Sequence, residues 1–324
     1  MGLARWLGSR PEWALVFSTI LVLSVDLRGT HAAEAPLGVY KGAGCDGVRK
    51  MEGFVAWFGR MPDRGIDFFA IDSWDAILSS SEWSIRCWSN TRLPMTFSLP
   101  MLPNDKRYSL ADGASGKFDH VFQSIASNLV KYNYGNAIVR IGWEFNGGWY
   151  PWSAKKDPQS WVAYWRRIVE VMRGVPGAAF RFDWCPVIGW GQIPPDRVYP
   201  GNDYVDIIGL DVYNQTWNPK VNTPEQRWTE LLTMSYGLQW QSDFAAKHGK
   251  PISFPEWGTG TRPDGHGGGD DAYFVEKMAA WISASNVAYH IYWDYPASDY
   301  NGVLSDGSRP NAGAAFLRSF GGVR

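Results

Sequence analysis

Eight short apolar segments, alternating with helical patterns, constrain the fold of this chain more than any other feature. They are rich in β-branched and aromatic residues, and several are apolar on both faces, as is typical of parallel strands covered by helices. Because parallel neighbours need helical crossovers between them, the alternation favours an α/β protein. We expect strands at residues 37–42, 67–74, 93–100, 137–144, 179–184, 205–213, 251–257 and 288–295.

Amphipathic helical patterns lie between these segments. The clearest covers residues 159–175, where Asp157 and Pro158 supply a cap and a first-turn proline. Residues 118–132 and 271–285 repeat the pattern. Eight strands, each followed by a helix or a long loop, predict a (β/α)8 TIM barrel, a fold that typically uses ~250 residues. We assign the catalytic barrel to residues 36–324, with no internal repeat or linker.

A doubly wound open sheet is the alternative fold. Such a sheet usually shows a glycine-rich first turn, and Gly42, Gly44 and Gly47 have nearly that spacing. However, no acidic residue closes a second strand ~20 residues further on, as dinucleotide binding would require. The barrel is therefore the preferred interpretation.

The N-terminus has the pattern of an export signal. Arg5 and Arg10 give a basic start, residues 13–25 are apolar, and small residues follow up to Ala33. The apolar run is too short to span a bilayer comfortably, although an uncleaved membrane anchor is the alternative. We interpret residues 1–32 as a signal peptide and expect a secreted or periplasmic protein.

Composition narrows the classes of partner. A formal net charge of −1 argues against binding to nucleic acid or to an anionic membrane surface. The chain has 19 Trp, and these crowd segments rich in Gly, Asn and Asp. Aromatic rings beside polar groups suit ligands with apolar faces and hydroxyl edges, such as sugars. We expect a monomer whose partner is a polysaccharide.

Histidines and cysteines show no metal-binding pattern. The five histidines lack ligand spacing and no C-x-x-C motif occurs, so we expect no metal and no cofactor. In an oxidising compartment Cys45 and Cys87 are a candidate disulfide, and Cys185 in a predicted strand is a candidate buried thiol.

Two glutamates end predicted strands. Glu144 ends the strand at 137–144, and Glu256 ends the one at 251–257. In a barrel, the loops after the carboxyl ends of the strands form the active site, and these two strands lie on opposite sides of the ring. A glutamate at a strand end is often a solvated loop residue or a helix cap. Two such residues, each beside tryptophan and glycine, favour glycoside hydrolysis, which needs two carboxyl groups, ~5–5.5 Å apart if the reaction retains configuration.

The residues around Glu144 extend this interpretation. The chain resembles the clan A glycoside hydrolases, and within them family 26, best known for endo-β-mannanases, over roughly residues 36–322. In the strand-4 motif of that family, Arg, Glu, Asn, Gly and Trp stand at fixed spacing. The matching positions here are Arg140, Glu144, Asn146, Gly147 and Trp149.

The resemblance implies roles for particular residues. It implies that Glu144 is the general acid/base and that Glu256 is the nucleophile of a retaining mechanism. It also implies that Tyr213 hydrogen-bonds the nucleophile and that Trp293 forms an aromatic platform under the sugar. One departure concerns the residue before the acid/base, which is His in the family and Trp143 here. This leaves open whether the substrate is mannan or another β-glycan, such as a bacterial exopolysaccharide.

Several of these positions have a structural alternative. Arg140 either holds Glu256 ionised or forms a structural ion pair with Asp211 or Asp72. Asn146 either binds a sugar hydroxyl or caps a turn. The full set of candidate substrate-binding residues is Arg140, Trp143, Asn146, Trp149, Tyr213, Trp257 and Trp293.

Other aromatic residues and one loop are weaker candidates. For Trp152 and Trp257, packing within a loop cluster competes with stacking on sugar. Trp190 and Trp217 are candidates for outer subsites. The glycine-rich residues 258–271 favour a flexible surface connection over a mobile loop across the cleft.

The function predicted from these features is a retaining endo-β-glycosidase with two catalytic glutamates. A carbohydrate-binding barrel that has lost catalysis is one alternative. Transglycosylation or glycan trimming during exopolysaccharide production is another. No G-x-S-x-G motif points to a serine hydrolase.

Overall fold

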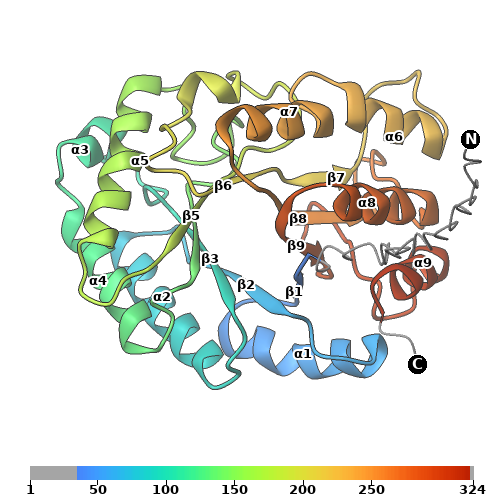
Figure 1. Ribbon diagram of the computed structural model, residues 1–324, viewed down its shortest axis with the longest axis horizontal. Coiled ribbons are helices and arrows are strands. Elements are labelled where there is room, and N and C mark those ends of the chain that lie inside the picture. The colour runs from blue at the N-terminus through green and yellow to red at the C-terminus, as the bar shows by residue number, and fades with distance from the viewer. Residues whose placement is uncertain (1–34, 322–324) are drawn as a thin grey trace, which may run out of the picture. The chain divides into compact units, whose positions relative to one another are not determined.

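Parallel strands pair around a closed ring in the computed structural model, which describes residues 35–321 (Figure 1). The strands are β1 (Leu37–Tyr40), β2 (Arg64–Phe68), β3 (Met95–Leu99), β4 (Ile138–Ile141), β5 (Arg181–Trp184), β6 (Ile207–Gly209), β7 (Val212–Asn214), β8 (Ile252–Thr259) and β9 (Val287–Trp293). The pairing of β1 with β9 and of β6 with β8 closes the ring. The (β/α)8 TIM barrel predicted from the sequence is therefore confirmed, and the open-sheet alternative is wrong.

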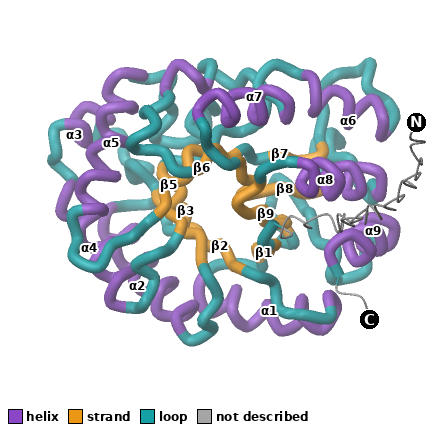
Figure 2. The backbone as a smooth tube through the Cα atoms, viewed as in Figure 1, coloured by secondary structure: helices purple, strands orange, loops and turns teal. Residues whose placement is uncertain are grey.

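The helices lie outside the ring of strands, as Figure 2 shows. The pattern at residues 159–175 corresponds to α5, in which Asp157 caps the helix by accepting a hydrogen bond from the Ser160 amide. The helices are α1 (Gly44–Phe58), α2 (Trp74–Ser89), α3 (Leu110–Ala114), α4 (Asp119–Lys131), α5 (Pro158–Arg173), α6 (Pro224–Thr233), α7 (Leu238–His248), α8 (Ala272–Ala284) and α9 (Pro310–Phe320), with a 3-10 turn, η1, at Pro195–Val198.

Two predicted strands differ from the observed ones. The strand expected at 67–74 begins at Arg64 and ends at Phe68. The strand expected at 205–213 is divided into β6 and β7, which both pair with β8 and form one stave of the barrel. At the division the Leu210 amide bonds to Ser253 on β8 and the Asp211 amide bonds to the Pro186 carbonyl after β5, so pairing with both neighbours continues through it.

Polar groups share the barrel interior with a small apolar cluster. Arg140 extends inward from β4, on the same face as Ile138. Below it Asp183 accepts hydrogen bonds from the hydroxyls of Ser253 and Tyr289, both 2.6 Å long. A larger apolar cluster packs between the strands and the surrounding helices. The charged groups inside the barrel are therefore paired or hydrogen-bonded.

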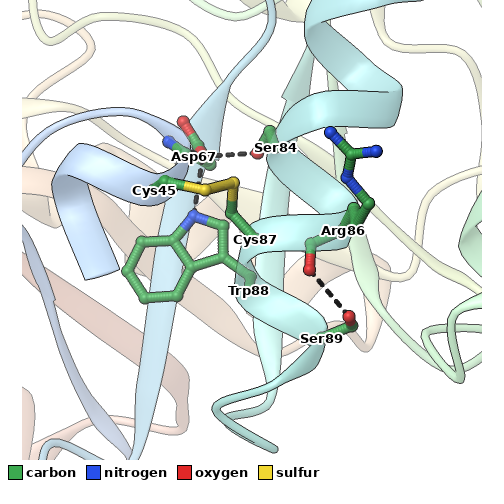
Figure 3. Close-up of a disulfide and its surroundings, with 8 residues drawn as sticks. Cys45, Asp67, Ser84, Arg86, Cys87, Trp88 and Ser89 are labelled. Carbon is green, nitrogen blue, oxygen red and sulfur yellow. Dashed lines mark hydrogen bonds between the residues drawn. A yellow bond between two sulfur atoms is a disulfide. The ribbon is translucent and has the colours of Figure 1, made fainter. Parts of the chain in front are cut away.

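A disulfide joins Cys45 on α1 to Cys87 on α2, with their Cα atoms 4.9 Å apart (Figure 3). Beside it the Asp67 carboxylate accepts hydrogen bonds from Ser84 and from Trp88 Nε1. The pairing suggested by the sequence is confirmed, and Cys185 is a buried free thiol.

The predicted signal peptide, residues 1–32, lies outside the described residues. Among the helices of residues 35–321, none is long and apolar enough to cross a membrane.

Candidate active site

A cavity of about 590 Å³ opens at the carboxyl end of the barrel. Loops that follow β4, β5, β7, β8 and β9 contribute to its walls. Both candidate catalytic glutamates face into it. The lining residues are Glu144, Trp149, Tyr150, Val187, Tyr213, Gln215, Trp217, Glu256, Arg262, Trp293, Ala297, Asp299 and Tyr300.

Glu144 is placed by an unusual turn of the backbone just after β4. Its φ is +52°, in the left-handed region that a residue with a side chain seldom adopts. Gly142 precedes it at φ +54°, where a Cβ would lie 2.4 Å from the Met101 sulfur. The Glu144 amide donates to the Cys185 carbonyl at 2.8 Å and fixes the turn. A strained conformation of this kind costs about 1–3 kcal/mol and is concentrated at functional sites.

The surroundings of Glu144 favour its protonated form. Burial is the largest influence, and repulsion from Glu256 adds to it, so that the pKa of Glu144 rises to about 8. Trp149 Nε1 donates to Glu144 Oε2 at 2.7 Å and opposes part of this rise. Near neutral pH the group therefore carries a proton that it can donate.

Glu256 lies in the opposite electrostatic setting. It is 7% exposed, and its two oxygens accept hydrogen bonds from different donors. The Arg140 guanidinium donates to Oε1 at 2.6 Å, and the Tyr213 hydroxyl donates to Oε2 at 2.6 Å. Both donors stabilise a negative charge and hold the carboxylate in one orientation.

Arg140 anchors this arrangement from below. It is fully buried and forms ion pairs with both Glu256 and Asp211. Arg140 therefore contacts Glu256 and Asp211 at once, whereas Asp72 is exposed and is not its partner. The Cys185 thiol donates to the other Asp211 oxygen at 3.3 Å. A buried guanidinium between two carboxylates is compensated on both sides.

Three of the predicted aromatic residues lie in the cavity wall. Trp149 is 59% exposed, with its indole bonded to Glu144. Trp293 is half-buried and stacks on Tyr40 with ring centres 4.5 Å apart. Tyr213 stands between Glu256 and Trp293, whose ring centre is 6.1 Å from its own. These rings give the cavity the flat apolar surfaces that sugars require.

Four other predicted binding residues do not line the cavity. Arg140 acts from beneath it, as described above. Trp143 is 4% exposed and packs against Tyr150 and Trp152, which stack on each other. Trp257 is fully buried against Tyr292 and the helices outside the barrel. Buried indoles offer no face to a sugar, so the binding roles expected for Trp143 and Trp257 are corrected to packing roles.

Asn146 is also buried, and it joins two loops. Its side-chain nitrogen donates to the Val187 carbonyl at 2.9 Å, and its oxygen accepts from the Val187 amide at 2.9 Å. The loop after β4 is thereby fixed to the loop after β5. Its side chain is occupied by these bonds, so the sugar-binding role expected for Asn146 is corrected to a structural one.

The sequence analysis missed several lining residues. Tyr150, Gln215, Arg262, Asp299 and Tyr300 all face the cavity. They sit in loops with no periodic pattern, so no signal in the sequence distinguished them from other loop residues.

The glycine-rich loop at 258–271 takes part in the wall. Backbone bridges pair Thr261 with Asn301 and Gln215 with Gly267. The Arg262 guanidinium lies over the Trp217 ring, 5.1 Å from its centre. The expectation of a flexible surface connection is therefore wrong for this loop, which is bonded to its neighbours.

Comparison with known proteins bears on this site. A family model described as "Glycosyl hydrolase family 26" matches residues 113–234, a segment that includes Glu144 and Tyr213. Over these residues the chain is similar to glycosyl hydrolase family 26. The resemblance inferred from the sequence is therefore confirmed.

Two relatives have the names of polysaccharide-cleaving enzymes. Endoglucanase H of Acetivibrio thermocellus is 26% identical over 234 residues, covering 66% of this chain and 23% of that protein. A mannan endo-1,4-beta-mannosidase of Bifidobacterium adolescentis is 25% identical over 201 residues, covering 55% of this chain and 19% of that protein. The chain thus matches less than a quarter of the length of either relative.

Solved structures agree on the fold. A Bacillus subtilis mannanase superposes with a TM-score of 0.62 at 18% identity, covering 89% of this chain and 85% of that one. A modular endo-beta-1,4-mannanase from Cellulomonas fimi gives a TM-score of 0.62 at 20% identity, covering 87% of this chain and 71% of that one. At this identity the likeness shows the barrel fold alone.

Proposed function

We propose that the protein is a retaining endo-β-glycosidase that hydrolyses a β-linked polysaccharide. One observation carries the proposal. Glu144 and Glu256 come from opposite sides of the barrel and line one cavity, where Glu144 has a raised pKa and Glu256 accepts hydrogen bonds from Arg140 and Tyr213. A carboxyl group that keeps its proton beside one held by two donors is suited to the acid and nucleophile roles.

The reaction follows from the positions and neighbours of the two glutamates. Glu256, held by Arg140 and Tyr213, attacks the anomeric carbon while Glu144 gives its proton to the departing glycosidic oxygen. An ester between Glu256 and the sugar results. Glu144, now ionised, takes a proton from water, and the water oxygen displaces Glu256 from the anomeric carbon. Two displacements restore the original configuration of the sugar.

The substrate class is supported by the aromatic walls and by the relatives. Trp149, Trp217 and Trp293 present indole faces to the cavity. One relative is named an endoglucanase and another a mannan endo-1,4-beta-mannosidase. A mannan-like polysaccharide or a bacterial exopolysaccharide suits both features. Trp143 stands where the family has His, so the identity of the sugar at the cleaved bond is a question for the substrate panel.

The test uses a panel of mannans, glucans, xylans and bacterial exopolysaccharides, with release of reducing ends as the readout. We expect Glu144→Ala and Glu256→Ala each to abolish hydrolysis of the active polymer. Glu82→Gln, which removes an exposed carboxylate on α2, is the matched control and should retain full activity.

Azide separates the two roles. With an activated aryl glycoside, azide should rescue Glu144→Ala to give a product of retained configuration. It should rescue Glu256→Ala to give the inverted product, because azide then attacks in a single displacement. Inversion by the unaltered protein would contradict the proposed mechanism.

Other outcomes identify the alternatives. Binding to a glycan without release of reducing ends from any polymer would point to a carbohydrate-binding barrel. Preferential transfer to an added acceptor sugar would point to a transglycosylase in exopolysaccharide production.

We further propose that the protein acts outside the cytoplasm as a monomer. The basis for the location is the signal-like residues 1–32. N-terminal sequencing of protein from the cell envelope and the medium tests whether they are removed. If residues 13–25 are retained in an envelope-bound protein, they act as a membrane anchor instead.

A further inference from the structure

A second hollow lies on the same rim of the barrel, apart from the candidate active site. Its volume is about 610 Å³, and it lies between the loop after β5 and the turn that joins α6 to α7. It shares no lining residue with the cavity that contains the glutamates. The lining residues are Trp190, Asp196, Leu232, Thr233, Met234, Ser235, Tyr236, Gln239, Trp240 and Asp243.

We propose that this hollow, the rim groove, binds a neutral stretch of the same polysaccharide at a distance from the bond that is cleaved. The inference rests on the proposed function and adds a second glycan site to it. Trp190 is 58% exposed, although a large apolar side chain on a soluble protein is usually covered. Exposed indoles bordered by amide, hydroxyl and carboxyl groups suit the apolar face and hydroxyl edge of a sugar.

The aromatic residues of the rim groove are held in place by their neighbours. The ring centres of Trp190 and Tyr236 are 5.4 Å apart, and those of Tyr236 and Trp240 are 5.0 Å apart. Trp240 stacks in turn on Phe244, at 5.1 Å. The platform is therefore a packed series of rings with Trp190 at its exposed end.

The backbone under this platform is also constrained. Tyr236 has a φ of +60°, which is rare for a residue with a side chain. Its carbonyl accepts a hydrogen bond from the Gly189 amide at 3.1 Å. Since Gly189 directly precedes Trp190, this bond fixes the two edges of the groove against each other.

The rim groove and the candidate active site are both lined by residues of the loop after β5. Val187 lines the cavity, and Trp190 lines the groove three residues later. Three residues of extended chain span at most ~11 Å, so the two sites are close neighbours. Asn146 fixes this loop through Val187 and also accepts the Gln192 amide at 2.6 Å. One extended polysaccharide can therefore occupy both sites.

Charge selects a neutral glycan for the rim groove. Asp196 and Asp243 line it, and none of its lining residues, all within the described part of the chain, is basic. In the neighbouring cavity the single lining cation, Arg262, is paired with Asp264 at 3.0 Å. Carboxylates accept hydrogen bonds from sugar hydroxyls but repel uronic acids and sulfated sugars.

The kinetic test compares Trp190→Ala with the unaltered protein on a long polymer and on an aryl glycoside. We expect the KM for the polymer to rise roughly three- to tenfold, the usual size of a lost aromatic contact, with kcat unchanged. The aryl glycoside reaches only the cavity, so its kinetics should not change. The matched control is Trp83→Ala, which removes a partly exposed tryptophan from α2, and it should leave both substrates unaffected.

A binding test is independent of hydrolysis. In native gels that contain hydroxyethylcellulose, glucomannan or galactomannan, we expect at least one polymer to retard the unaltered protein and Trp83→Ala more strongly than Trp190→Ala, which keeps only the candidate active site. Carboxymethylcellulose, which has the same backbone as hydroxyethylcellulose but carries negative charges, should retard none of the three proteins. Equal retardation of Trp190→Ala and Trp83→Ala, or stronger retardation by the anionic polymer, would overturn the inference.

The two proposals fail in distinguishable ways. If the unaltered protein cleaves the polymer and Trp190→Ala has an unchanged KM, the rim groove is refuted while the glycosidase stands. If nothing is cleaved but retardation still depends on Trp190, the glycosidase is refuted while the groove stands.

Discussion

Glu144 combines three properties that a proton donor needs. It faces the cavity, burial and Glu256 raise its pKa to about 8, and a left-handed backbone fixes its position. Each property comes from a different neighbour, so the role depends on the folded barrel rather than on the residue alone.

The raised pKa predicts the pH dependence of catalysis. Since the proposed acid must be protonated, we expect kcat/KM for a polysaccharide to fall as the pH rises through about 8. An aryl glycoside with a very good leaving group needs little proton donation, so glycosylation of the protein by it should show a much weaker fall. An equal fall in rate above pH 8 for the two substrates would contradict the assignment of Glu144 as the acid.

The same shift predicts how stability changes with pH. A carboxyl group whose pKa is higher in the folded than in the unfolded state stabilises most below the unfolded value, and this contribution is lost as the pH rises through the folded value. Glu144 should therefore weaken the fold progressively between pH ~4.5 and ~8.

Glu144→Gln removes this dependence. We expect its melting temperature to exceed that of the unaltered protein by an amount that grows over this pH range, equivalent to roughly 1–2 kcal/mol at the alkaline end. Calorimetry at several pH values measures the difference. A constant difference at all pH values would show that the carboxyl group does not titrate as described.

At the scale of elements, the disulfide joins the first two helices of the barrel. Cys45 and Cys87 enclose β2 and most of α1 and α2, so reduction releases a loop with a sequence separation of 42 residues. We expect the double variant Cys45→Ser/Cys87→Ser to lose about 2–4 kcal/mol of unfolding free energy while its kcat is retained. Urea unfolding with and without a reductant tests this, because only the unaltered protein should respond to the reductant.

The elements also show how far the sequence can be interpreted. Strands such as β3 and β8 were predictable because runs of apolar, β-branched and aromatic residues are buried on both faces. The start of β2 was missed because Arg64, a charged residue, occupies a buried place where an apolar residue is expected. The division between β6 and β7 falls at Leu210 and Asp211, inside the single strand expected at 205–213, where no local pattern marks it.

The site was predictable to the same degree. Glu144 and Glu256 stood out because strand ends in a barrel converge on one rim. Trp257 has the same local pattern as a sugar platform, but its side chain points outward from the ring into the helical layer. Direction at a strand end after a bulge depends on register, and the register of β8 shifts between Phe254 and Trp257.

At the scale of the whole molecule, the barrel closes within the described residues. β1 begins at Leu37 and pairs with β9, and β6 pairs with β8, so the ring is complete within residues 35–321. We expect a protein lacking residues 1–32 to fold with the same melting temperature and the same kcat/KM as the full chain. A loss of more than a few degrees would show that the N-terminal segment contributes to the barrel.

The sealed position of Arg140 has a consequence for the conditions in which the protein can work. Dissolved ions weaken interactions between charges on a surface, but they do not enter a site from which water is excluded. Arg140 and Asp211 are fully covered, and Glu256 nearly so. Activity on a neutral substrate should therefore change less than about twofold between dilute buffer and molar sodium chloride.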